Sequence, residues 1–240
     1  PKENILWRAA VPGPGSSSPI VFGDRVFLTC WTGYGTADMG TDINKLTRHL
    51  VCYSLKDGKQ LWKADVPAEQ PEDPYQGFIS EHGYATHTPV TDGKHVYVFF
   101  GKSGALGFDM SGKKLWQTNL GKSSSSKRWG SAASPLLHDG KLIVNASDEG
   151  RAVVALDTES GSILWKAEGD NLDSAYGSPA LVKREDKIDL VLAVPGDLWG
   201  MNPDTGKLRW YANHSLTGNV SPTVINSGKD LFIFGGYPAT

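Results

Sequence analysis

The chain has 240 residues, of which 39% are hydrophobic and 21% are charged, and its formal net charge is −2. This composition is typical of a soluble globular protein with room for one large domain or one array of repeats. Lys and Arg form no basic stripe, which argues against a nucleic-acid partner, and no apolar run approaches the roughly 18 residues that a membrane-spanning helix needs.

Two short marks alternate along the chain and reveal a repeat. The first mark ends in Trp and occurs at Leu6-Trp7, Leu61-Trp62, Leu115-Trp116, Leu164-Trp165 and Arg209-Trp210. The second is a Ser/Thr-Pro pair and occurs at Ser18-Pro19, Thr88-Pro89, Ser134-Pro135, Ser178-Pro179 and Ser221-Pro222. The last three spacings of the second mark are 46, 44 and 43 residues, close to the roughly 40–50 residues of a four-stranded propeller blade.

Each repeat divides into four short predicted strands joined by turns rich in Gly and Asp. A fourth strand of an incomplete blade is expected at residues 5–9, and no segment shows a helical period. The β-rich second strands are expected at Val96–Phe100, Leu142–Ala146, Ile188–Val194 and Leu231–Phe234. We therefore predict an all-β chain, a single partial β-propeller over residues 1–240. Its blades are expected near residues 16–66, 84–119, 131–168 and 175–212, with partial blades at 1–10 and 218–240.

Large side chains recur at the start of each outer strand and require a structural explanation. Neighbouring blades diverge toward the rim, and an indole fills the resulting wedge while burying roughly 150–250 Å². We therefore expect structural docking roles for Trp62, Trp116, Trp165 and Trp210. The two cysteines, Cys30 and Cys52, fall on adjacent predicted strands, so a cross-strand disulfide is conceivable, but two buried free thiols are favoured.

One repeat resembles a known motif. The segment Ala155–Trp165 reads ALDTESGSILW and is similar to the tryptophan-docking motif A-x-D-x-x-T-G-x-x-x-W of quinoprotein-type propellers, with further copies at Cys52–Trp62 and Gly200–Trp210. The chain thus resembles the PQQ-binding-like, BamB-like repeat family. The resemblance implies a ring of seven or eight blades and a periplasmic or otherwise extracytoplasmic location. The missing blades would come from the rest of a longer chain, which we favour, or from a second copy.

Candidate binding residues follow from the expected geometry, because the first strand of each blade lines the channel of a propeller. The channel and rim candidates are Glu81, His82, Tyr84, His87, Arg128, Trp129, Asp173, Tyr176 and Asn219. His82 and His87 beside Glu81 match no metal-ligand spacing, so neither a metal ligand nor a catalytic residue is predicted. Arg128 and Trp129 either clamp a carboxylate or stack a ring, or else form a linker and a packed Trp. Loops at residues 31–49 and 67–83 are long enough to be functional.

Three functions remain open. The first is a non-catalytic scaffold that binds a protein or a small ligand, as BamB-like members of the family do. The second is part of a PQQ-dependent dehydrogenase. The resemblance would then require adjacent cysteines and a calcium site, whereas Cys30 and Cys52 are 22 residues apart. The third is the sensor domain of a larger receptor or kinase. The first is favoured, so no cofactor is expected, and PQQ and calcium belong only to the second.

Overall fold

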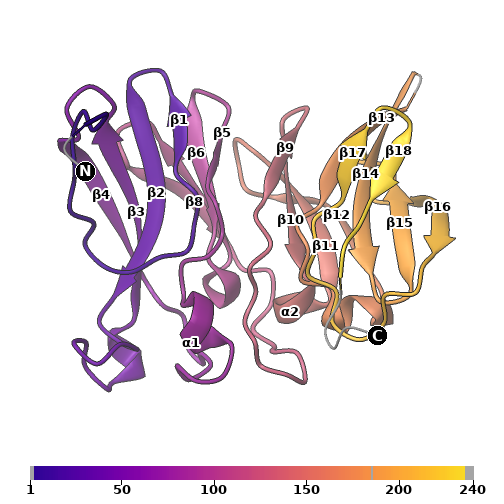
Figure 1. Ribbon diagram of the computed structural model, residues 1–240, viewed down its shortest axis with the longest axis horizontal. Coiled ribbons are helices and arrows are strands. Elements are labelled where there is room, and N and C mark those ends of the chain that lie inside the picture. The colour runs from indigo at the N-terminus through magenta and orange to yellow at the C-terminus, as the bar shows by residue number, and fades with distance from the viewer. Residues whose placement is uncertain (1–2, 185, 236–240) are drawn as a thin grey trace.

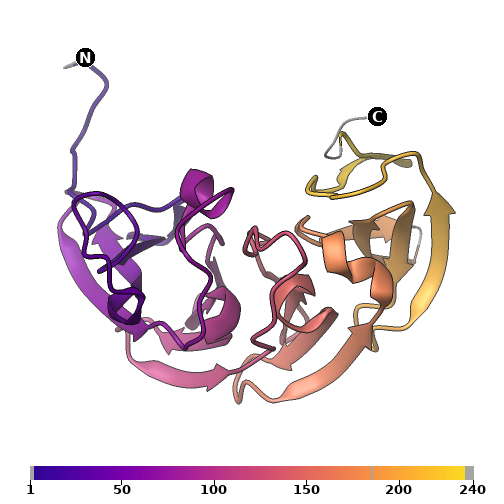
Figure 2. The same ribbon diagram turned by 90° about the horizontal axis from the view of Figure 1, so that it is seen from below.

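Antiparallel sheets make up the computed structural model, which describes residues 3–184 and 186–235 (Figure 1). Four four-stranded sheets and one two-stranded sheet stand side by side along an arc, which Figure 2 shows from below. The prediction of an all-β partial propeller with four complete blades is thereby confirmed. No helix in these described ranges is long and apolar enough to cross a membrane.

The strands of each blade follow chain order, and each pairs antiparallel with the next. The first blade contains β1 (Ile20–Phe22), β2 (Arg25–Thr32), β3 (Thr47–Ser54) and β4 (Gln60–Pro67). The second contains β5 (Val90–Thr91), β6 (His95–Phe99), β7 (Ala105–Asp109) and β8 (Lys114–Thr118). The third contains β9 (Leu136–His138), β10 (Lys141–Ala146), β11 (Ala152–Asp157) and β12 (Ile163–Glu168).

The fourth blade contains β13 (Ala180–Arg184), β14 (Lys187–Val194), β15 (Asp197–Met201) and β16 (Leu208–Asn213), and a last hairpin contains β17 (Ile225–Ser227) and β18 (Asp230–Phe232). Five short helical turns lie between strands in the part of the chain that the structure describes: η1 (Ile43–Lys45), α1 (Ile79–His82), η2 (Gly101–Ser103), α2 (Ser147–Gly150) and η3 (Asp170–Ser174). These turns are too short to give a helical period, which is why the sequence showed none. The fourth strands trace the outer rim of the arc (Figure 2).

A register irregularity recurs at the same place in all four blades. It lies between the third and fourth strands, next to the residue that pairs with the rim Trp; in the third blade it falls between Ala155 and Leu156, and Ala155 pairs with Trp165. A bulge at this point redirects the side chains that follow it. The repeat therefore encodes the direction of the Trp as well as its position.

The rim indoles join each blade to the next one. Each indole Nε1 donates to a backbone carbonyl in the next blade: Trp7 to Leu55 at 2.7 Å, Trp62 to Met110 at 2.9 Å, Trp116 to Thr158 at 3.0 Å and Trp165 to Pro203 at 3.0 Å. The Trp116 ring lies on Gly161, which has a φ of +70° and where an added Cβ would sit 2.5 Å from the ring. Glycine is required there for both its conformation and its lack of a side chain.

Two outer Trp residues differ in their surroundings. Trp7 docks on the first blade, yet residues 5–9 carry no strand pairing, because no described segment lies beside them as a third strand. Trp210 donates instead to Asp189 Oδ2 of its own blade at 2.8 Å.

The hydrophobic core is divided among the junctions between blades. One buried cluster joins the first and second blades, another the second and third, and a third the third and fourth. Full burial of each large apolar side chain contributes roughly 1.5–3 kcal/mol. Cys30 and Cys52 are both buried free thiols and belong to different clusters of the first blade, so the favoured prediction of two free thiols agrees with the structure. Burial raises the pKa of each thiol to about 11.

Candidate functional site

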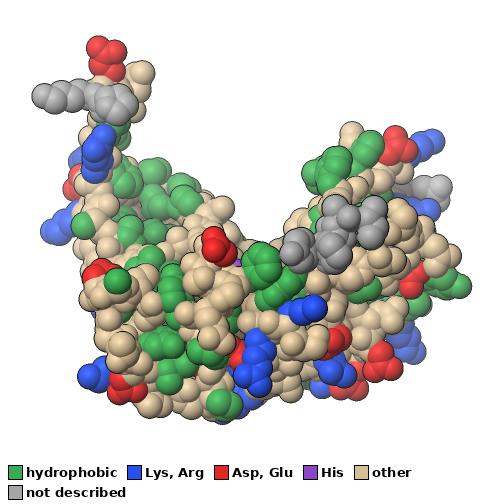
Figure 3. Space-filling model, turned by 60° about the horizontal axis from the view of Figure 1, so that its bottom comes forward, with side chains coloured by type: hydrophobic (Ala, Val, Ile, Leu, Met, Phe, Trp, Pro, Cys, Tyr) green, Lys and Arg blue, Asp and Glu red, His purple; other side chains and the backbone are tan. Residues whose placement is uncertain are grey.

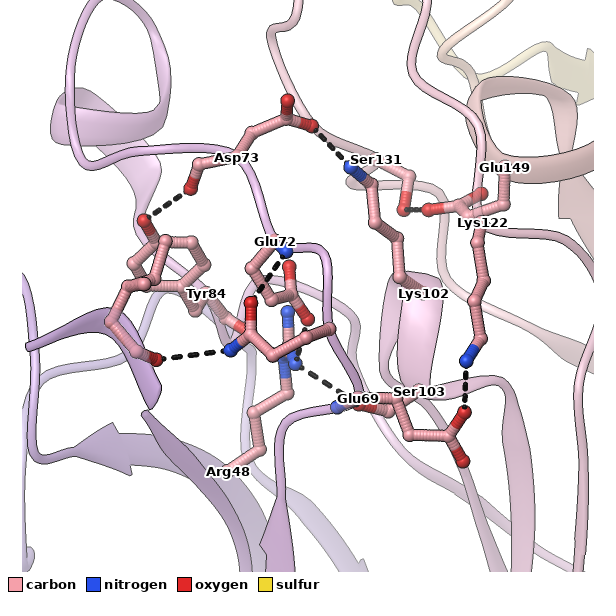
Figure 4. A network of polar contacts seen from close by, with 12 residues as sticks. Arg48, Glu69, Glu72, Asp73, Tyr84, Lys102, Ser103, Lys122, Ser131 and Glu149 are labelled. Carbon is pink, nitrogen blue, oxygen red and sulfur yellow. Dashed lines mark hydrogen bonds and ion pairs between the residues drawn. The ribbon is translucent and has the colours of Figure 1, made fainter. Parts of the chain in front are cut away.

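Loops from the first three blades meet at the same end of the blades, at the bottom of Figure 1, where α1 and α2 lie. The segment between β4 and β5 carries α1, and η2 and α2 connect the second and third strands of their blades. Charged and polar side chains from these loops form the network drawn in Figure 4. An aromatic cleft lies beside this network.

Arg48 on β3 organises the first part of the network. Its Nε donates to the Tyr84 carbonyl at 2.8 Å, and its Nη1 donates to Glu72 Oε1 at 2.7 Å and to Ser103 Oγ at 3.2 Å (Figure 4). The Arg48 and Glu72 side chains are only 5% and 4% exposed. A buried pair of this kind is stable only when hydrogen bonds satisfy both charges, and here they anchor the loop after β4 to the first and second blades.

Lys102 on η2 organises the second part. Its Nζ lies 2.8 Å from Asp73 Oδ2 and 2.7 Å from Ser124 Oγ, and Ser124 Oγ donates to the same carboxylate oxygen at 2.6 Å. The Tyr84 hydroxyl donates to the Asp73 carbonyl at 2.7 Å. The run of four serines at residues 123–126 is therefore anchored at this point.

Two adjacent acids on α2, Asp148 and Glu149, are buried and accept few hydrogen bonds. Asp148 accepts a hydrogen bond from the Ser125 backbone at 2.9 Å, and Ser131 Oγ donates to Glu149 Oε1. Burial, followed by the charge of Asp148, raises the pKa of Glu149 to about 8, and burial also raises the pKa of Asp148. In the described ranges no partner reaches Glu149 Oε2.

His87 lies on the other side of Ser131. Its Nε2 is 3.0 Å from Ser131 Oγ, while its buried Nδ1 has no hydrogen-bond partner among the described groups. Burial lowers the pKa of His87 to about 3, with a further contribution from Arg48, so the ring is neutral. A cavity of about 30 Å³ borders both His87 and Glu149, enough for one or two waters to satisfy the two unpaired atoms.

The aromatic cleft is larger and more open. It has a volume of about 460 Å³, and its lining includes Phe78, His82, Trp129 and Tyr176, together with Ser178, Ser221 and Thr223. The Trp129 ring centroid is 4.4 Å from that of Phe78 and 5.6 Å from that of Tyr176. Hydrophobic side chains also gather at the floor of the notch between the two arms of the arc in Figure 3.

His82 links the cleft to the polar network. Its Nδ1 is 2.9 Å from Thr86 Oγ1, and its Nε2 is 2.8 Å from the Trp129 carbonyl. Both ring nitrogens are therefore engaged in holding the Trp129 loop against the β4–β5 segment. The Tyr176 hydroxyl donates to Ser125 Oγ at 2.8 Å and fixes a second wall of the cleft in the same way.

The structure groups some of the predicted site residues and separates others. His82, Trp129 and Tyr176 line the cleft, and His82, Tyr84 and His87 border the polar cavity. Glu81 and Arg128 are exposed and line neither space; Asp173 pairs with Arg151 at 3.2 Å, and Asn219 is buried. All nine residues stay predictions, and five of them, His82, Tyr84, His87, Trp129 and Tyr176, line the cleft or the cavity.

Sequence reasoning missed the charged centre of the network, which contains Arg48, Lys102, Ser131 and Glu149. Arg48 lies inside a strand, and Glu149 follows one, so neither belongs to an identifiable motif. A signal was present in Gly101-Lys102-Ser103, which lacks a phosphate-loop pattern but places a lysine directly after a hydrophobic strand. A buried lysine at such a position requires a partner, and here Asp73 supplies it.

Comparison with known proteins places these features in a family. The family model for outer membrane protein assembly factor BamB matches residues 47–238. The chain is 24% identical over 184 residues to a polyvinylalcohol dehydrogenase of a Pseudomonas species, which covers 69% of this chain but only 25% of that protein. The chain thus spans about a quarter of the length of this curated relative.

Solved structures share the fold at low sequence identity. BamB from Moraxella catarrhalis is 15% identical with a TM-score of 0.54, and the match covers 95% of this chain and 72% of that one. The quinohemoprotein alcohol dehydrogenase from Comamonas testosteroni is 13% identical with a TM-score of 0.58, over 91% of this chain and 39% of that one. At these identities the likeness concerns the fold alone.

Proposed function

This chain belongs to the family of outer membrane protein assembly factor BamB, and from that membership we propose that it is a non-catalytic propeller segment that binds a partner in its aromatic cleft. The family description also supports an extracytoplasmic location, most plainly the periplasm. The partner is a protein or small ligand that presents an uncharged aromatic or large apolar group.

The aromatic cleft carries this proposal. Its volume of about 460 Å³ falls within the roughly 300–1,000 Å³ of ligand pockets. Phe78, Trp129 and Tyr176 offer the aromatic surface that dominates the energetics of many binding sites. Its titratable lining groups are His82, whose nitrogens are engaged, and Tyr176, whose pKa is raised to about 12 by burial. An uncharged group therefore suits the cleft better than an anion or cation.

The polar network supports a structural role more than a catalytic one. Arg48 and Lys102 are paired with Glu72 and Asp73 and are not available to a substrate. The Ser131 hydroxyl donates a hydrogen bond to Glu149 Oε1, so its hydrogen does not point toward His87 and His87 does not act as a base on Ser131. Activation of a serine requires that the base accept this proton. The network instead fixes the loops that form the cleft.

A PQQ-dependent dehydrogenase is the second candidate, favoured by the sequence likeness to a polyvinylalcohol dehydrogenase. The residues around the cleft do not fit that chemistry. PQQ is a carboxylated quinone, yet the cleft lining contains no Lys or Arg. Near the cleft, the described residues also lack three His, Cys, Asp or Glu ligand atoms close enough to share one calcium ion.

Calorimetric titration with N-acetyl-phenylalaninamide, a neutral probe, tests the cleft. We expect weak, saturable binding to the unmodified chain and a loss of at least about tenfold in Trp129→Ala, since removal of a central aromatic anchor costs 2 kcal/mol or more. Tyr211→Ala is the matched control, because Tyr211 is an aromatic residue 63% exposed on β16, outside the cleft. Equal binding by both variants would contradict the proposal.

A second arm tests catalysis separately. The chain is incubated with PQQ and Ca²⁺, dialysed, and assayed for dye-linked oxidation of methanol, ethanol and polyvinyl alcohol. We expect neither retained quinone nor turnover. Turnover would overturn the non-catalytic assignment while leaving the cleft measurement intact.

A further inference from the structure

A second group of ligating side chains lies at the other end of the blades. The β9–β10 turn places His138 and Asp139 beside Asp204 in the β15–β16 turn of the next blade. Figure 1 shows both turns at the end of the blades opposite α1 and α2. One nitrogen or oxygen from each residue lies within 4.8 Å of the other two. This group is therefore separate from the cleft and from the network of Figure 4.

His138 lacks a hydrogen bond in this group. Its Nε2 is 3.6 Å from Asp139 Oδ2 and 3.8 Å from Asp204 Oδ1, and its side chain is only 8% exposed. Both distances exceed those of N–H···O hydrogen bonds, which are about 2.7–3.2 Å. The carboxylates are accessible to solvent, with Asp139 79% and Asp204 53% exposed.

The corresponding turn of the preceding blade also carries a histidine, His95, although His95 begins β6 whereas His138 ends β9. His95 Nδ1 lies 3.1 Å from the Tyr97 hydroxyl, and that hydroxyl donates to Asp92 Oδ2 at 2.9 Å. Asp92 Oδ1 also accepts from the backbone of Lys94 and His95 at 2.8 and 2.7 Å. His95 Nδ1 and both carboxylate oxygens of Asp92 thus have hydrogen-bond partners within the protein. The same part of the third blade leaves its histidine for another partner.

We propose that His138, Asp139 and Asp204 bind a divalent transition-metal ion that links the third and fourth blades. Ligands at about 2.0–2.2 Å from one ion are separated from each other by roughly 3.0–3.5 Å. The observed 3.6 and 3.8 Å are therefore too long for hydrogen bonds but close to metal-ligand spacing. One imidazole and two carboxylates suit Zn²⁺ better than Ca²⁺ or Mg²⁺, which prefer oxygen alone.

Lys141 competes with the metal for this site. Its Nζ is 3.0 Å from Asp204 Oδ1, one of the oxygen atoms that the ion would use. Binding of the ion requires Lys141 to turn away or Asp204 to use its second oxygen. Removal of the ammonium group should therefore strengthen metal binding, an effect that a purely structural role of the cluster would not produce.

Calorimetric titration of the whole chain with Zn²⁺ in a non-chelating buffer tests the proposal, with thermal unfolding as a second readout. We expect one saturable site, an increase in Tm on Zn²⁺ addition, at least about tenfold weaker binding in His138→Gln because one of three ligands is lost, and tighter binding in Lys141→Met. His95→Gln is the matched control and should bind Zn²⁺ as the unmodified chain does. Ca²⁺ should produce neither effect.

Two results would overturn the metal site. The first is no Zn²⁺ binding by the unmodified chain or by Lys141→Met. The second is equal Zn²⁺ affinity of His138→Gln and the unmodified chain, which would place the ion elsewhere. If His138→Gln does not fold, Asp204→Asn replaces it, because Asp204 lies on an exposed turn and its loss should weaken binding in the same way.

Discussion

Arg48 on β3 and Glu72 in the loop after β4 face each other, with 2.7 Å between Nη1 and Oε1 and almost no solvent contact for either side chain. Arg48→Ala would leave Glu72 buried without its cation, and we expect the free energy of unfolding to fall by about 3–5 kcal/mol. Lys166→Ala is the control. It removes the exposed Lys166–Glu168 pair of β12, and pairs of that kind contribute about 0–1 kcal/mol. Urea denaturation measures both, and similar losses would show that the buried pair has no special weight.

The contact between Trp116 and Gly161 can be separated from backbone strain. Gly161→Ala adds a Cβ 2.5 Å from the indole at a φ of +70°, whereas Gly140→Ala has a φ of +71° with its nearest neighbour 3.9 Å away. We expect Gly140→Ala to cost about 1–2 kcal/mol from left-handed backbone alone. Gly161→Ala should cost a further 1–3 kcal/mol, approximately, from overpacking. Thermal unfolding of the two variants gives the difference in their losses of stability. Equal losses would mean that the Trp116 ring moves away from the added Cβ without a measurable cost.

Glu149 should make the protein less stable as the pH rises. Its pKa is near 4.5 when unfolded and about 8 when folded, so the folded state holds its proton more tightly. This contribution is complete below pH 4.5 and is lost as the pH rises toward 8, on the order of 1.4 kcal/mol per unit. Glu149→Gln should remove this slope and be more stable than the unmodified chain at pH 8. Unfolding free energies at pH 5 and pH 8 test it, with the surface variant Glu159→Gln keeping the original slope.

His87 should act in the opposite direction. Its pKa falls from 6.5 to about 3 on folding, so the unfolded chain binds a proton in this range and the folded chain does not. The stability associated with neutral His87 is present above pH 6.5 and is lost as the pH falls toward 3. His87→Gln should flatten the acid side of the stability profile even if its overall stability is lower. An unchanged slope between pH 6.5 and 4 would contradict the assignment of His87 as a buried neutral ring.

The blades could be predicted from sequence because every repeat contains its own local marks for an outer strand and for the turn on which the neighbouring Trp docks. Trp116 and Gly161, for example, mark an outer strand and the turn that receives it, and both recur at blade spacing. The polar network could not be predicted. Arg48 pairs with a residue in the loop after β4, and Lys102 pairs with Asp73 across a blade junction. These pairings depend on how three blades pack, which no local pattern records.

The aromatic cleft could be predicted in part. His82, Trp129 and Tyr176 were expected near the channel because they precede the Ser/Thr-Pro marks, and the structure places all three in one cleft. Phe78 was noted only as part of a long loop, since its position depends on α1. Arg128, adjacent to Trp129 in sequence, lies outside the cleft because the chain turns there with a φ of +51°. Neighbours in sequence therefore need not share a site when a left-handed turn separates them.

The division of the core among blade junctions has a consequence for how the protein unfolds. Each junction has its own docked indole and its own buried cluster, so energetic coupling is mainly between adjacent blades, as in linear repeat arrays. A lesion at one junction should then divide the molecule into two cooperative units instead of weakening it uniformly. Amide hydrogen exchange in Gly161→Ala would show the boundary, with faster exchange concentrated at the second and third blades and the outer blades left protected.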